Sequence, residues 1–124
     1  MLTVLVADDE FAVLEVLSMA LESEGHRVLK AGDGADALRV LVSQPCDVVV
    51  CDETMPVMNG VQLVEAMRAD PRLADIPVVM IVDGFRQGPL PEGIAVLHKP
   101  ILLSRLFSTV GEAGAIHASR KPSK

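Results

Sequence analysis

The sequence predicts an α/β domain built on one doubly wound, five-stranded parallel sheet with helices on both faces. Short runs of strand-forming residues alternate with longer segments in which apolar residues recur every three or four positions. Two of the strand runs, 47–51 and 78–82, are apolar almost throughout, as strands buried on both faces are. The chain has 124 residues, which suits a single domain, and 50% of them are hydrophobic.

The first half of the chain predicts two strands, each followed by a helix. Residues 2–7 form a short apolar run that stops at Asp8. One helical face then follows, made of Val13, Leu14, Val16, Leu17, Ala20 and Leu21, and Gly25 ends it. Residues 26–30 predict the second strand. Asp33 is placed to cap a second helix, which Pro45 ends and which carries Leu38, Leu41 and Val42.

The second half predicts three further strands, at 47–51, 78–82 and 94–97. Asn59 begins a third helix with Val61, Leu63, Val64 and Met67 inward, and Pro71 ends it. A last helix holds Leu102, Leu103, Leu106, Phe107 and Val110. Between the fourth and fifth strands, residues 83–93 contain three Gly and two Pro, a composition that disfavours a helix. We therefore predict that the helix expected there is reduced or missing.

Composition and charge exclude several classes of partner. The net charge is −6 and the sequence pI is about 4.9, which disfavours direct binding to nucleic acid. No apolar run reaches the length of a membrane helix, and the start of the chain does not resemble a signal peptide. Cys46 and Cys51 are expected to be free buried thiols, so we expect a cytoplasmic protein. We place the domain at 1–118 and a basic C-terminal tail at 119–124.

Charged residues fall at the carboxyl ends of the predicted strands. Asp8 and Asp9 end the first strand, Asp52 the third and Asp83 the fourth, while Lys99 follows the fifth. Ligands of open parallel sheets bind beyond this edge, where the winding changes direction. Clustered carboxylates without His or Cys favour a hard cation such as Mg²⁺. A carboxylate, a hard cation and a lysine together suit phosphoryl transfer, because that reaction needs positioning and charge neutralisation.

Three motifs resemble those of response-regulator receiver domains, the phospho-accepting modules of two-component signalling. They are Ala7-Asp8-Asp9-Glu10, the stretch Asp52-Glu53-Thr54-Met55-Pro56-Val57-Met58-Asn59-Gly60, and Lys99-Pro100. The resemblance covers nearly the whole chain and implies a flavodoxin-like fold with strand order 2-1-3-4-5. It also implies a cis Lys99-Pro100 peptide bond.

The resemblance assigns roles to five residues. Asp52 would accept the phosphoryl group. Asp9, Asp52 and the carbonyl of Thr54 would bind Mg²⁺ directly, with Asp8 holding a water on the metal. Lys99 would pair with Asp52 and later with the phosphoryl group. No other cofactor is implied.

The same resemblance implies the partners of the domain. The donor would be a phosphohistidine on a sensor histidine kinase or phosphotransfer protein, and an unidentified downstream protein would read the state by direct contact. The domain would not be an enzyme acting on a separate substrate, although it would promote its own phosphorylation and dephosphorylation. Direct binding to nucleic acid or to a membrane is not expected.

Two positions depart from the pattern of the family. Val82 stands where receivers have a Ser or Thr hydroxyl that binds a phosphoryl oxygen, and Val96 stands where they have an aromatic switch residue. These departures predict a weak conformational response to phosphorylation. They also leave open a pseudo-receiver, an interaction module that works without phosphate.

A dinucleotide-binding site is a further alternative. Gly32-Asp33-Gly34-Ala35-Asp36-Ala37 reads G-x-G-x-x-A after a strand and before a helix. Asp33 and Asp36 would, however, place two negative charges at the pyrophosphate. This alternative also leaves Asp9 and Lys99-Pro100 without a role, so we interpret Asp33 and Gly34 as a turn and a helix cap.

Overall fold

The computed structural model describes residues 1–84 and 89–120, with the side chains of 118–120 left out. Five parallel strands form one sheet in the order β2-β1-β3-β4-β5, as predicted. The strands are β1 (Thr3–Ala7), β2 (Arg27–Ala31), β3 (Val48–Asp52), β4 (Val78–Val82) and β5 (Ala95–His98). The helices are α1 (Phe11–Ser23), α2 (Gly34–Ser43), α3 (Gly60–Arg68) and α4 (Leu103–Arg120).

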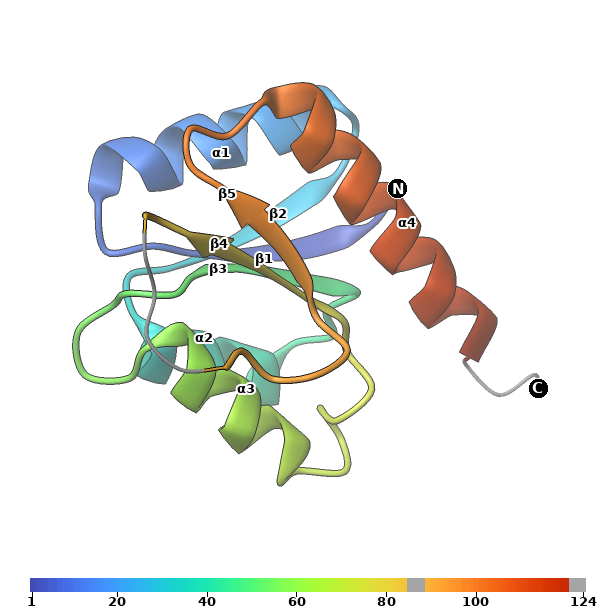
Figure 1. Cartoon of the computed structure of the whole chain (residues 1–124). Coiled ribbons are helices and arrows are strands. Elements are labelled where there is room, and N and C mark those ends of the chain that lie inside the picture. The colour runs from blue at the N-terminus through green and yellow to red at the C-terminus, as the bar shows by residue number, and fades with distance from the viewer. Residues whose placement is uncertain (85–88, 121–124) are drawn as a thin grey trace.

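Helices cover both faces of the sheet, so the molecule has three layers. Helices α1 and α4 lie on one face, and α2 and α3 lie on the other (Figure 1). Every residue of β3 and β4 is buried, which confirms the inference drawn from their continuous apolar runs. Strand alternation sends successive side chains to the two faces, so the sheet supports two aliphatic cores. One core packs under α1 and α4, and the other under α2 and α3.

The helix boundaries follow local signals that the sequence contains. Asp33 caps α2 as predicted, because its side chain accepts a hydrogen bond from the Asp36 backbone N–H at 2.7 Å. Asn59 begins α3 with a capping box, in which its side chain and that of Gln62 each accept a hydrogen bond from the other's backbone N–H.

The predicted inward faces were partly wrong. Val16 is 58% exposed, because it follows Leu14 by two residues and therefore lies about 200° around the helix from it. The buried stripe of α1 instead consists of Leu14, Leu17, Ser18 and Leu21. Val42 lies within α2 as predicted but is exposed, and Leu102, which was predicted within the last helix, precedes α4 and is 66% exposed.

The connection between β4 and β5 was predicted to contain a reduced helix or none. Its described residues, 83–84 and 89–94, form no helix, in agreement with the prediction of a reduced or missing helix, and residues 85–88 lie outside the described residues. Helix α4, the last of the chain, runs to Arg120, and residues 121–124 of the predicted basic tail lie outside the described residues.

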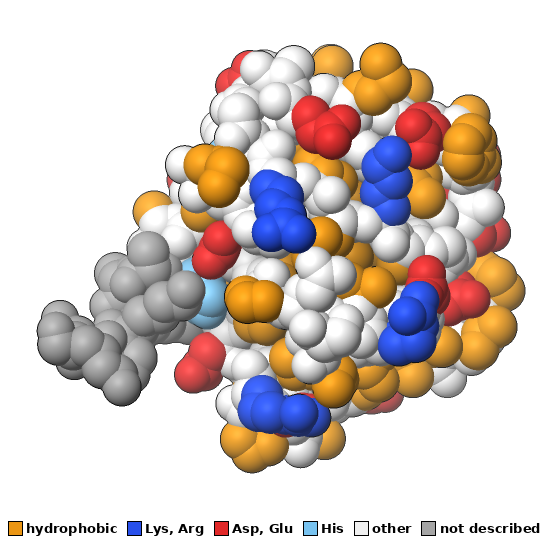
Figure 2. Space-filling model, turned by 180° about the vertical axis from the view of Figure 1, so that it is seen from behind, with side chains coloured by type: hydrophobic (Ala, Val, Ile, Leu, Met, Phe, Trp, Pro, Cys, Tyr) orange, Lys and Arg blue, Asp and Glu red, His pale blue; other side chains and the backbone are white. Residues whose placement is uncertain are grey.

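The described residues bear on two further predictions, on membrane binding and on nucleic-acid binding. Of the helices in the described ranges, none combines the length and the apolar character needed to cross a bilayer. On the face shown in Figure 2, the described Lys and Arg side chains are separated by acidic, apolar and other groups. This face therefore offers no continuous basic surface to a nucleic acid.

Candidate functional site

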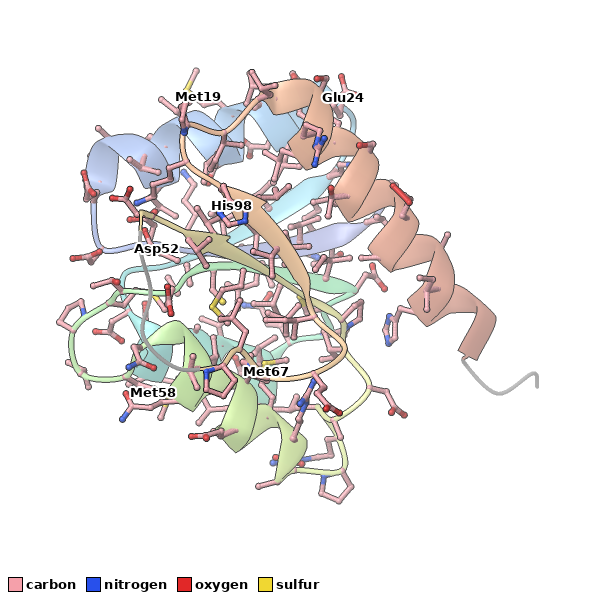
Figure 3. All side chains as sticks on the ribbon, in the orientation of Figure 1. Met19, Glu24, Asp52, Met58, Met67 and His98 are labelled. Atoms are coloured by element: carbon pink, nitrogen blue, oxygen red, sulfur yellow. The ribbon has the colours of Figure 1, made fainter. Side chains whose placement is uncertain are left out.

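Asp52 is the centre of the candidate site. It is the last residue of β3, between β1 and β4, and it lies where the carboxyl ends of the strands meet (Figure 3). The side chain is buried, and both of its oxygens accept hydrogen bonds. Oδ1 accepts a hydrogen bond from the Thr54 backbone N–H at 2.9 Å, and Oδ2 accepts one from Lys99 Nζ at 3.0 Å. The carboxylate is thus held in one orientation by a loop amide and by a cation.

Lys99 reaches Asp52 from beyond the end of β5. Its backbone N–H donates to the Val82 carbonyl at 3.0 Å, which extends the β4–β5 pairing by one residue. The peptide bond to Pro100 is cis, as the resemblance implied. The hydrogen bond to Asp52 raises the pKa of the Lys99 ammonium, and the charges of Asp52, Asp8 and Asp83 act in the same direction. Lys99 is therefore a firmly charged partner for an anion at this edge.

Asp8 supplies a second buried carboxylate beside Asp52. Only 1% of Asp8 is exposed, and its Oδ1 accepts a hydrogen bond from the Glu10 backbone N–H at 2.9 Å. Its Oδ2 has no hydrogen-bond partner among the described residues. Burial, together with the neighbouring Asp52 charge, raises the pKa of Asp8 to about 6. A buried carboxylate oxygen without a partner, next to another carboxylate, is the kind of group that a hard cation stabilises.

Asp9 and Thr54 lie at the rim of the site. Both residues are exposed. Within the described ranges, no three side chains of His, Cys, Asp or Glu are grouped closely enough to hold a metal ion by themselves. The structure thus brings together Asp8, Asp52 and Lys99, and the direct role of Asp9 stays a prediction. Mg²⁺ needs only one or two protein carboxylates, because it keeps several waters.

Backbone hydrogen bonds hold the loop after Asp52 in place along its length. The Glu53 N–H donates to the Ile81 carbonyl at 2.9 Å, and the Gly60 N–H donates to the Glu53 carbonyl at 3.0 Å. Between them, the Met58 N–H bonds the Pro56 carbonyl at 2.7 Å around Val57, whose φ is 68°. This γ-turn is strained for a β-branched residue, so the surrounding contacts must hold it in place.

One contact of this loop was missed by the sequence analysis. The Gly34 N–H donates to the Met58 carbonyl at 2.9 Å and so joins the start of α2 to the loop. A Cβ on Gly34 would lie 2.2 Å from the Met58 carbonyl oxygen, so only glycine fits. This close approach explains the glycine of the dinucleotide-like motif without a nucleotide. A glycine directly after a capping residue was the signal available in the sequence.

A pocket opens beside the acceptor, between α1 and the segment that follows β5. It has a volume of about 580 Å³, and its lining includes Glu10, Val13, Asp83, Lys99 and Pro100. Asp83 is exposed there, next to the buried Val82. Sequence reasoning had not connected Glu10 or the apolar side of α1 with this edge, because their proximity depends on how α1 packs.

Comparisons with known proteins agree with this geometry. A family model described as the response regulator receiver domain matches residues 4–110. The chain is 38% identical over 112 residues to the transcriptional regulatory protein PrrA of Mycobacterium tuberculosis, and the match covers 86% of this chain and 47% of PrrA. It is 35% identical over 119 residues to the protein PilH of Pseudomonas aeruginosa, and that match covers 89% of this chain and 95% of PilH.

Solved structures show the same fold. The chemotaxis response regulator CheY4 of Vibrio cholerae superposes with a TM-score of 0.80 at 28% identity, covering 91% of this chain and 98% of that one. Relatives such as PrrA are longer, and this chain spans only about half of PrrA.

Proposed function

This chain belongs to the response-regulator receiver domain family of two-component signalling, and on that premise we propose that Asp52 accepts the phosphoryl group. The observation that carries the proposal is the Lys99–Asp52 ion pair, 3.0 Å long, beside buried Asp8 at the carboxyl edge of the sheet. A carboxylate held by an ammonium group at this edge has the nucleophile and the charge partner that phosphoryl transfer requires.

The proposed donor is a phosphohistidine on a sensor histidine kinase or a phosphotransfer protein. An Asp52 carboxylate oxygen forms a bond to phosphorus while the bond between phosphorus and the imidazole nitrogen breaks. The nitrogen keeps the electron pair and the histidine leaves. Because a carboxylate is ionised at neutral pH, no base has to activate it. The chain itself is the substrate of this transfer, and the resulting acyl phosphate is the signal.

Lys99 stabilises the charge that the transfer brings to the site. In the unphosphorylated protein its ammonium donates to Asp52 Oδ2. When the phosphoryl group arrives, the same ammonium lies within reach of the new oxygens without a change of fold. Fixed donors aimed at developing charge contribute about 10²- to 10³-fold in rate in enzymes whose donors have been removed one at a time. Thr54 holds the other oxygen of Asp52 through its backbone N–H and so keeps the carboxylate oriented.

Mg²⁺ is the cofactor that these residues fit. Asp9, Asp52 and the Thr54 carbonyl would bind it directly, with Asp8 holding a water on the metal. The unpartnered Asp8 Oδ2 and the elevated pKa of Asp8 support a cation at this point. When bound, the ion would neutralise negative charge on the two carboxylates and on the phosphoryl oxygens.

The experiment that tests the proposal is incubation with Mg²⁺ and the small donor phosphoramidate, followed by intact-mass measurement. We expect one added phosphoryl group on the wild-type chain and none on Asp52→Asn, which is nearly isosteric but is not a nucleophile. Asp75→Asn is the matched control, because Asp75 is exposed and precedes β4 at the opposite edge of the sheet.

The outcomes separate the two functions that the sequence left open. Equal loading of the wild-type chain and Asp52→Asn would show that Asp52 is not the acceptor. No loading of any variant would favour an interaction module that works without phosphate.

A further inference from the structure

Asp83 is an acidic residue at the mouth of the acceptor site. It is the first residue after β4, and the hydrogen bond from the Lys99 N–H to the Val82 carbonyl, 3.0 Å long, keeps this point next to Lys99. Asp83, Lys99, Pro100 and Glu10 line the same pocket. Asp83 is exposed, whereas Asp52 is buried, so the carboxylate of Asp83 faces solvent at this pocket and that of Asp52 does not.

The charges around this mouth are strongly unequal. Among the described residues that line the pocket, Lys99 is the only one with a cationic side chain, while Glu10 and Asp83 are both acidic. The Lys99 ammonium is already hydrogen-bonded to Asp52, and the charges of Asp8 and Asp83 also act on it. An incoming phosphoryl group therefore has to share this single ammonium with three carboxylates. Of these three, only Asp83 is exposed.

We propose that Asp83 is a selectivity residue that slows the loading of Asp52 from small dianionic phosphodonors. The inference rests on the proposed function of Asp52 and adds a preference among donors to it. Asp83 repels a dianion at the pocket mouth and competes with it for Lys99. A donor that carries less negative charge meets less repulsion, so the ratio of the two loading rates depends on Asp83.

The affected step is an ordinary transfer. With acetyl phosphate, an Asp52 oxygen forms a bond to phosphorus, the bond from phosphorus to the acetate oxygen breaks, and acetate leaves with the electron pair. Asp83 takes no part in bond making. It changes the local concentration of the donor and the availability of Lys99, and both effects weaken as salt screens exposed charges.

The test compares two donors of different charge at low and high ionic strength in the presence of Mg²⁺. Acetyl phosphate is a dianion at neutral pH and phosphoramidate is a monoanion. Loading of wild type, Asp83→Asn and Asp83→Lys is followed by intact mass, and the melting temperature of each variant checks its folding. Glu24→Gln is the matched control, because it removes the same charge at the far end of α1 from Asp52 (Figure 3).

We expect Asp83→Asn to raise the rate of loading from acetyl phosphate about three- to tenfold at low salt, the effect of one screened exposed charge. Asp83→Lys should raise it further, phosphoramidate should respond less, and high salt should reduce every difference. Equal rates for wild type and Asp83→Asn at low salt, or the same gain in Glu24→Gln, would overturn the inference while Asp52 remains the acceptor. Failure of wild type to load from either donor would instead overturn the proposed function, and the inference with it.

Discussion

The two halves of the carboxyl edge of the sheet differ in their buried charged groups and in the hydrogen bonds of their loops. On the β1–β3 side, buried Asp8 and Asp52 lie beside a loop that backbone hydrogen bonds join to β4 and to the start of α2. On the β4–β5 side, β5 has four residues, and the described residues that connect β4 to β5 form no helix. Val82 is buried and offers no hydroxyl, and half-buried Val96 offers no large ring to move.

The difference teaches that accepting a phosphoryl group and reporting it place separate demands on the fold. Acceptance needs fixed charges at one point, and the β1–β3 side together with Lys99 provides them. Reporting needs a second element with two stable positions that the phosphoryl group can bias. The β4–β5 side lacks the hydroxyl that would join the two. We therefore expect substitutions near Asp52 to have large effects and a phosphoryl mimic to move β4 and β5 little.

The largest effect is expected for Lys99→Met, which keeps the unbranched chain up to the ε-carbon position and removes the charged amine. Loading of Asp52 should slow about 10²-fold, because the ammonium is the only cation among the described residues that line the pocket. Intact mass over time measures this directly, which is useful in a chain without Trp or Tyr. A loss of less than threefold would mean that the charge of Lys99 is dispensable and that its hydrogen bond to Asp52 is structural.

Gly34→Ala should be the most damaging small change to stability. A Cβ there meets the Met58 carbonyl oxygen at 2.2 Å, so the loop after Asp52 or the start of α2 must shift. We expect a loss of about 1–3 kcal/mol of unfolding free energy. The matched control is Gly111→Ala in α4, where nothing lies within 4 Å of the new methyl group. That variant should gain about 0.5–1 kcal/mol. Chemical denaturation measures the unfolding free energy of both variants. Equal changes in the two variants would contradict the close packing of Gly34 against Met58.

Mg²⁺ binding should stabilise the folded protein, and Asp9→Asn should weaken Mg²⁺ binding. Saturating Mg²⁺ at about a hundred times its Kd is expected to add about 2.7 kcal/mol to the unfolding free energy of wild type. Asp9→Asn should need at least about tenfold more Mg²⁺ for the same shift, a loss seen when partners of metal ligands are removed. Melting temperature against Mg²⁺ concentration provides the measurement. Identical curves for the two proteins would remove Asp9 from the ligand set.

The smallest effect is expected for the response of β4 and β5 in the wild-type protein to a mimic of the phosphoryl group. A beryllofluoride mimic with Mg²⁺ should slow amide exchange in β4 and β5 less than about threefold, equivalent to about 0.7 kcal/mol. A hydrogen bond to a charged group is worth roughly 1.5–3 kcal/mol, out of about 5.5 kcal/mol needed to reverse a two-state equilibrium. Val82→Thr should therefore enlarge the response. Strong protection of β4 and β5 in wild type would show that reporting does not require this hydroxyl.

Much of the fold could be predicted from the sequence because its signals are local. Alternating runs indicated the strands, the continuous apolar run of β3 indicated burial on both faces, and Asp33 and Asn59 marked helix starts that the structure confirms. The prediction was wrong at Val16 and Leu102. Apolar residues at helical spacing identify a helix, but the width of its buried stripe depends on what packs against it.

The sequence by itself also determined which residues lie at the carboxyl edge, since parallel strands must end there together. Only the tertiary structure decided how they meet. It gives the Lys99–Asp52 pair that the resemblance implied its distance of 3.0 Å, and it leaves Asp8 Oδ2 buried without a described partner. It also places Asp83 in the pocket of Lys99 and Gly34 against Met58. The physical reason is that distances of a few ångströms between side chains depend on strand order, twist and loop packing, which bring together residues far apart in the chain.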